Sequence, residues 1–148
     1  LNIDIVSPQA ALDDYKMIVV PSLPILSDEL VDRLAELDTP ILFGPRTGSK
    51  MTDFAIPAEL PPGPLQQILP LKVERVESLR SGLVEQGNSF GVTRWIENIE
   101  TDLTADESLM DGRGIAFSHG QIRYLACWPP EILLKKIFSQ MTLFKVQP

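Results

Sequence analysis

The strongest constraint on the fold is a segment of helical periodicity that lies between two short apolar runs. Residues 17–20 and 41–43 are continuously apolar, which is typical of strands buried on both faces of a parallel sheet. Between them, Ser27 can cap a helix and Pro40 prevents its continuation. The apolar side chains of this helix recur on one face: Leu30, Val31, Leu34 and Leu37. This order predicts a doubly wound α/β sheet in which 17–20 is a central strand.

The expected elements outside this unit are shorter. They are a strand at 3–6, a helical turn at 65–69, strands at 72–76 and 92–99, a hairpin that joins 115–117 to 121–126 through Gly120, and a helix that starts at Pro129 or Pro130. Segment 81–89 is predicted to be a loop, and Asp106 and Glu107 to be solvated. The final helix carries an apolar stripe: Ile132, Leu133, Ile137 and Met141.

Composition limits the classes of partner. The 148 residues are 44% apolar and 22% charged, and we predict one folded domain over residues 1–148. A net charge of −7 disfavours nucleic acid and anionic membranes as partners. With one cysteine, Cys127, and one histidine, His119, we expect no disulfide, metal site or cofactor, and a cytoplasmic location. Because Leu1 leads directly into the strand expected at 3–6, the sequence is expected to be a fragment.

The segment GPRTGSK at 44–50 follows a predicted strand and superficially resembles a phosphate-binding loop. Only three residues separate its two glycines, however, and Ser49 precedes Lys50, so the pattern does not match that motif. Two alternatives remain: a turn with two solvated cations, or a contact loop, since partners often meet such sheets at strand ends. The candidate residues for a subunit contact or an active-site wall are Arg46, Thr47, Gly48 and Lys50.

Cys127 lies between a predicted strand and a predicted helix, where the nucleophile of an α/β hydrolase would stand. Leu125 and Pro129 occupy the flanking positions that such a strained turn needs to be small, so a buried thiol and an exposed turn histidine are favoured. The alternative function is a small stand-alone cysteine hydrolase or amidotransferase-like enzyme that uses Cys127 with His119. A third hypothesis is a flavin-binding module.

No carboxylate is assigned a catalytic role, because Glu97 and Glu100 would share a face only if their segment were helical. Trp95 and Trp128 could stack on a sugar, but buried aromatic anchors are the favoured interpretation.

A family resemblance runs through nearly the whole chain. It is carried by IDIVSP at 3–8, YKMIVVPSL at 15–23, LSDEL at 26–30, FGPRTG at 43–48, PGPL at 62–65, RW with Glu97 at 94–97, and YLA before WP at 124–129. Together these segments resemble the trimerisation domain of family 42 β-galactosidases.

The resemblance implies a flavodoxin-like or class I glutamine amidotransferase-like three-layer sandwich with a mostly parallel sheet, lacking its first strand and helix. It implies a non-catalytic oligomerisation domain next to a catalytic (β/α)₈ barrel of the same chain, in a homotrimeric parent enzyme. That parent would hydrolyse terminal β-galactosides with retention, through two glutamates in the barrel. Because the missing strand would leave an edge open, we also expect the isolated chain to associate as its concentration rises.

Overall fold

The computed structural model describes residues 2–143 of the chain. Its helices are α1 (Asp28–Ala35), the 3₁₀ helix η1 (Gly63–Gln67) and α2 (Glu131–Leu143). Its strands are β1 (Ile18–Val20), β2 (Ile41–Phe43), β3 (Lys72–Ser78), β4 (Glu85–Gln86), β5 (Gly91–Val92), β6 (Trp95–Glu100), β7 (Ala105–Ser108), β8 (Gly114–His119) and β9 (Ile122–Leu125).

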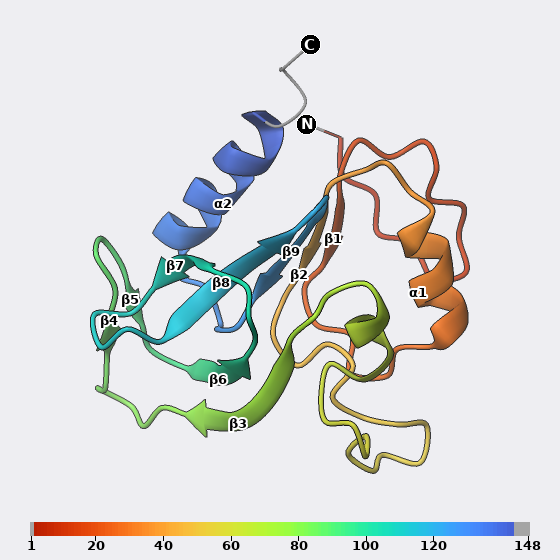
Figure 1. The fold of residues 1–148 in the computed structure, drawn as a ribbon. Coiled ribbons are helices and arrows are strands. Elements are labelled where there is room, and N and C mark those ends of the chain that lie inside the picture. Colours follow the sequence, from red (N-terminus) through yellow and green to blue (C-terminus); the bar gives the residue numbers. More distant parts are fainter. Residues whose placement is uncertain (1, 144–148) are drawn as a thin grey trace.

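The main sheet has five strands in the order β1-β2-β9-β8-β7 (Figure 1). The pairs β1/β2 and β2/β9 are parallel, whereas β9/β8 and β8/β7 are antiparallel. One core cluster joins Leu30, Val31 and Leu34 of α1 to one face of this sheet. A second cluster joins Leu133 and Ile137 of α2 to the other face.

The expected mostly parallel, flavodoxin-like or amidotransferase-like sandwich is therefore wrong. The sheet is mixed, and the described chain has two α-helices among many short strands. The reason lies in the connections. Gly120, with a φ of 57°, makes a tight turn between β8 and β9, and so short a link permits only antiparallel pairing. Between β2 and β8 the chain forms loops, the 3₁₀ helix η1 and strands β3 to β7 where a doubly wound fold would place crossover α-helices.

The N-terminal part departs most from expectation. β1 lies at the edge of the sheet and Val19 is exposed, so the prediction of a central strand at 17–20 is wrong. Residues 3–6 form no strand, and Ile5 is almost fully exposed. An alternating pattern becomes a strand only where another strand is free to pair with it. The expected association of the isolated chain stays a prediction.

The predicted helix after Ser27 is confirmed. Ser27 Oγ accepts a hydrogen bond of 3.2 Å from the Leu30 amide, and the acidic first turn holds Asp28 and Glu29. This is the usual way to satisfy free amides at a helix start. The helix nevertheless ends at Ala35, so Leu37 packs on the core from the connection that follows.

A second antiparallel pair, β3 and β6, continues into the main sheet. The Glu97 amide donates to the Ala126 carbonyl at 2.7 Å, and the Trp128 amide donates to the Trp95 carbonyl at 2.9 Å. Ile96 and Cys127 therefore face each other. Since side chains alternate along a strand, Ile96 and Cys127 enter the α2 core while Trp95 and Glu97 point to the opposite side.

Several middle elements differ from the prediction. The strand at 92–99 is split into β5 and β6, and the loop at 81–89 contains β4. β7 was not predicted, and its Glu107 is buried beside Lys136 of α2, with a Nζ–Oε1 distance of 2.5 Å. A carboxylate needs such a partner when it is buried. The turn near 65–69, the strand at 72–76 and the hairpin around Gly120 are confirmed.

The α2 stripe is confirmed for Leu133, Ile137 and Met141, which are buried, but Ile132 is 54% exposed. One residue corresponds to about 100° of helix rotation, so Ile132 points away from the sheet when its neighbour Leu133 points towards it.

Ile137→Ala and Ile132→Ala form a matched pair. The first leaves a cavity in the α2 core and is expected to lower the free energy of unfolding by about 2–5 kcal/mol. The second removes exposed atoms and should change it by about 0.5 kcal/mol or less. Urea unfolding measures both, and equal losses would contradict the assignment of the buried stripe.

Candidate functional site

The predicted contact loop, residues 44–50, leaves the carboxyl end of β2 and lies tightly against the chain that leaves β1. The Gly44 amide donates to Val20 at 2.8 Å, Gly48 to Leu23 at 2.9 Å and Lys50 to Pro24 at 2.9 Å. At Gly44, an added Cβ would lie 1.9 Å from the carbonyl oxygen of Pro21. Main-chain contact therefore fixes the path of the loop.

Two of the four candidate residues, Thr47 and Gly48, stabilise the conformation of the loop itself. Thr47 is fully buried, and its hydroxyl donates to the Gly44 carbonyl at 2.9 Å. Gly48 is also buried and has a φ of 61°, a conformation that glycine adopts without cost. Arg46 is exposed and Lys50 is half-buried. Of the four candidates, these are the two whose side chains remain accessible.

The buried side chain of Glu97 anchors the contact loop through hydrogen bonds. Its side chain is 2% exposed, and its carboxylate accepts three hydrogen bonds: from the Arg46 amide at 2.7 Å, from Trp95 Nε1 at 3.2 Å and from the Tyr124 hydroxyl at 2.6 Å. The donors come from the loop, β6 and β9. One buried carboxylate thus ties the loop to both parts of the sheet.

Arg46 itself is held in an unusual position. Its φ of 67° lies in the left-handed region that non-glycine residues rarely occupy. Its guanidinium carbon lies 5.3 Å from the centre of the Trp95 ring, within the range of a cation–π contact. Residues in such conformations persist only where surrounding contacts hold them, and they are frequent at functional sites. Here the contacts with Glu97 and Trp95 hold Arg46 in place.

Trp128 follows β9, and its amide donates to the carbonyl of Trp95 in β6. Trp95 is half-buried and Trp128 is 48% exposed, so the expectation of two buried anchors is wrong for Trp128. We call Arg46, Trp95 and Trp128 together the Arg–Trp surface. Arginine and tryptophan are enriched where protein interfaces derive most of their binding energy.

Glu97 belongs to the segments that carry the family resemblance and was assigned no catalytic role, but its part as an anchor of the loop was not predicted from the sequence. Its spacing from Trp95 was the available signal, since residues two apart in a strand share a face. Glu97 and Glu100 are three apart in β6 and lie on opposite faces, one buried and one exposed. The burial of Glu97 keeps it from any sugar in solution.

Burial raises the pKa of Glu97, and its three hydrogen bonds offset this only in part. The folded state consequently binds a proton more tightly than the unfolded chain does. Its stability therefore falls as the pH rises from the ordinary carboxyl range through the raised pKa. Burial and the adjacent Glu97 also raise the pKa of Tyr124 well above its ordinary value.

Glu97→Gln should remove this pH dependence, because an amide does not ionise and its oxygen can still accept from Arg46 and Trp95. Relative to the variant, the wild-type protein is expected to lose unfolding free energy as the pH rises from the ordinary carboxyl range through the raised pKa of Glu97. Urea unfolding at several pH values measures the difference. Parallel stability curves for the two proteins would contradict the titration of Glu97.

Cys127 and His119 do not form a catalytic pair. His119 is exposed at the turn before β9, whereas Cys127 is buried beyond the other end of that strand. Burial and, second, the charge of Glu97 raise the pKa of the Cys127 thiol to about 12. A nucleophilic cysteine needs the opposite, a lowered pKa and access to substrate, so the alternative of a cysteine hydrolase is wrong.

In the folded protein Cys127 should react with iodoacetamide far more slowly than a free thiol. At pH 7 a thiol with this pKa is ionised in only about one molecule in 10⁵. Mass spectrometry of timed samples, with a urea-unfolded sample as the control, measures the rate. Fast labelling of the folded protein would contradict the buried position.

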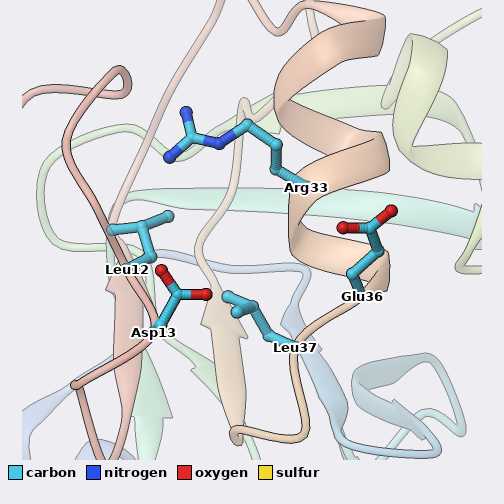
Figure 2. Close-up of a pocket in the computed structure, with 5 residues that line it drawn as sticks. All are labelled: Leu12, Asp13, Arg33, Glu36 and Leu37. Carbon is cyan, nitrogen blue, oxygen red and sulfur yellow. The ribbon is translucent and has the colours of Figure 1, made fainter.

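A small cleft of about 250 Å³ lies between the N-terminal segment and α1 (Figure 2). Leu12, Asp13, Arg33, Glu36 and Leu37 line it. Arg33 is already engaged, since it donates to the Pro8 carbonyl at 2.8 Å and also to that of Ala10. The cleft therefore lies where the N-terminal segment packs on α1, and Arg33 holds the two together.

Across residues 2–143, no cluster of three histidine, cysteine, aspartate or glutamate side chains is arranged to hold a metal ion. Within the same range, no helix has the length and apolar character needed to cross a membrane.

Comparison with known proteins gives close relatives. A β-galactosidase of Thermus thermophilus is 45% identical over 145 residues, which are 95% of this chain and 22% of that protein. The β-galactosidase BgaA of a Thermus species is 47% identical over 138 residues, which are 90% of this chain and 21% of that protein. The chain thus spans about a fifth of the length of the curated relatives it matches.

Solved structures agree with these relatives. The β-galactosidase of the psychrophilic Marinomonas ef1 superposes with a TM-score of 0.90 at 34% identity, over 94% of this chain and 22% of the other. That of the haloarchaeon Halorubrum lacusprofundi gives a TM-score of 0.82 at 28% identity, over 93% and 23%. The mixed sheet is thus the fold that this chain shares with part of a β-galactosidase.

The family model described as the β-galactosidase trimerisation domain matches residues 1–143. With this match over almost the whole chain, the chain belongs to the β-galactosidase trimerisation domain family.

Proposed function

We propose that this chain, as one domain over residues 1–148, holds together the subunits of a larger β-galactosidase, as a trimer. The family match over residues 1–143 carries the proposal, and the chain corresponds to only about a fifth of each relative. The rest of the subunit, including a catalytic barrel, is then its partner within the same polypeptide.

The reaction would take place in that barrel, where two glutamates hydrolyse terminal β-galactosides with retention. This chain contributes no reacting group, because Glu97 is buried and its oxygens are occupied by three donors. The one cysteine is buried and free, which supports a cytoplasmic enzyme.

The contact between subunits would include the Arg–Trp surface and Lys50. Copies that each carry a net charge of −7 repel one another, so association is helped where a fixed cation meets an acidic surface. Arg46 meets this need with little loss of freedom, because its main chain is held by Glu97 and its guanidinium lies on Trp95. A side chain fixed before binding loses less entropy on binding.

Arg46→Ala and Lys50→Ala in the full-length enzyme test this contact. Each is expected to raise the concentration at which the trimer dissociates, Arg46→Ala by about tenfold. Sedimentation velocity over a dilution series measures this, and the KM for a galactoside shows whether the loop also borders a neighbouring active site. Arg80→Ala, which removes an exposed cation before β4, is the control.

If both loop variants match the Arg80→Ala control in trimer dissociation and in KM, the contact-loop proposal is wrong.

A further inference from the structure

The contact loop is held in two different ways along its length. The amides of Gly44, Gly48 and Lys50 donate to main-chain carbonyls of β1 and of the segment after it, and these acceptors do not ionise. Arg46 instead donates its amide to the carboxylate of Glu97 at 2.7 Å. The tip of the loop is therefore the part whose main chain depends on an ionisable side chain.

The two carboxylate oxygens of Glu97 meet donors of different kinds. Oε1 accepts from the Arg46 amide and, at 3.2 Å, from Trp95 Nε1, and both of these groups can only donate. Oε2 lies 2.6 Å from the Tyr124 hydroxyl, which can either donate or accept. A proton taken up by Glu97 therefore goes to Oε2, where the carboxyl group donates to Tyr124 in place of accepting from it.

Proton uptake leaves Arg46 with a weaker acceptor. A hydrogen bond to an ionised group is roughly twice as strong as one between neutral groups. Burial raises the pKa of Glu97, while its hydrogen bonds with Tyr124, Arg46 and Trp95 and, last, the charge of Arg46 lower it. Contacts that lower a pKa bind the ionised form more tightly than the neutral form. Neutral Glu97 consequently holds both the amide and the guanidinium of Arg46 less firmly.

We propose that Glu97 and Tyr124 form a pH-sensitive latch on the contact loop. While Glu97 is ionised, the tip of the loop is locked. When Glu97 takes up a proton from the solvent, its hydrogen bond with Tyr124 reverses and persists, and the tip around Arg46 opens more often. The latch consists of hydrogen bonds within this chain, so it does not require the proposed contact between subunits.

Among the described residues, the ionisable groups that act on Glu97 are Arg46 in the loop, Tyr124 in β9 and Cys127 after β9. A guanidinium is a permanent cation. Tyr124 and Cys127 both have raised pKa values, mainly through burial, so they stay protonated at neutral and acidic pH. On β3, the residue paired with Glu97 is Val76, which carries no charge. The group that titrates in this cluster is thus Glu97.

The latch and the whole fold respond to pH with opposite signs. Burial of the Glu97 charge makes the fold less stable as the pH rises through the raised pKa of Glu97. The same ionisation strengthens the anchor of Arg46, so the tip of the loop becomes more firmly held over the same range. A loop that opened only with the whole fold would follow the stability of the fold, and the two signs would then agree.

Hydrogen exchange of the Arg46 amide in the full-length enzyme tests the latch. Mass spectrometry with fragmentation to single amides measures the rate at several pH values, and each rate is divided by the intrinsic rate at that pH. We expect the protection of the Arg46 amide to be about tenfold higher above the raised pKa of Glu97 than below it. The Gly48 amide, which donates to the Leu23 carbonyl at 2.9 Å, is the internal control and should show no such step.

Two variants assign the step to its groups. Glu97→Gln reproduces the neutral carboxyl group, since its oxygen accepts from Arg46 and its nitrogen donates to Tyr124. Its Arg46 protection should stay at the low, acidic wild-type value at every pH. Tyr124→Phe keeps the buried ring and removes a donor that lowers the pKa of Glu97, so the step should move to higher pH. Protection of Gly48 in each variant shows that the fold is retained.

A wild-type Arg46 amide whose protection is as independent of pH as that of Gly48 overturns the latch. A step that persists in Glu97→Gln, or one that does not move in Tyr124→Phe, overturns it as well. None of these results depends on the oligomeric state, so the failure of the latch leaves the proposed function intact.

Discussion

The buried carboxylate of Glu97 is the interaction that fixes the loop at 44–50 and the strand ends around it. It takes the Arg46 amide, the Trp95 indole and the Tyr124 hydroxyl as donors, and these groups belong to a loop and to two different strands. An unpaired charge in this position would cost several kcal/mol. With three donors, the same charge fixes the loop, and its burial makes the stability of the fold depend on pH through the raised pKa of Glu97.

The rigidity of this end supports the proposed role of the loop in assembly. Arg46 lies on Trp95 in a fixed main-chain conformation, and the same loop runs through Gly48 to a close contact with Pro62. Little order would remain to be gained if a neighbour bound there. Surfaces arranged before contact lose less entropy on association, so more of their buried area contributes to affinity.

Local structure was well predicted from the sequence where a few neighbouring residues decide it. The Ser27 cap, the turn at Gly120 and the helix after Pro130 all follow from side-chain chemistry within one turn of the chain. Errors arose where pairing partners decide the outcome. Residues 3–6 form no strand, and the strand expected to be central at 17–20 lies at the sheet edge. The antiparallel β8–β9 hairpin makes the sheet mixed, although a mostly parallel sheet was expected.

The sequence by itself determined the family resemblance, the capped helix after Ser27 and the hairpin at Gly120. Only the tertiary structure decided that Glu97 anchors the loop at 44–50, that Trp128 is exposed and that Cys127 and His119 lie at opposite ends of β9. The physical reason is distance along the chain. Glu97 meets Arg46 across 51 residues and Tyr124 across 27, and burial created by such distant segments has no signature in the local pattern of either one.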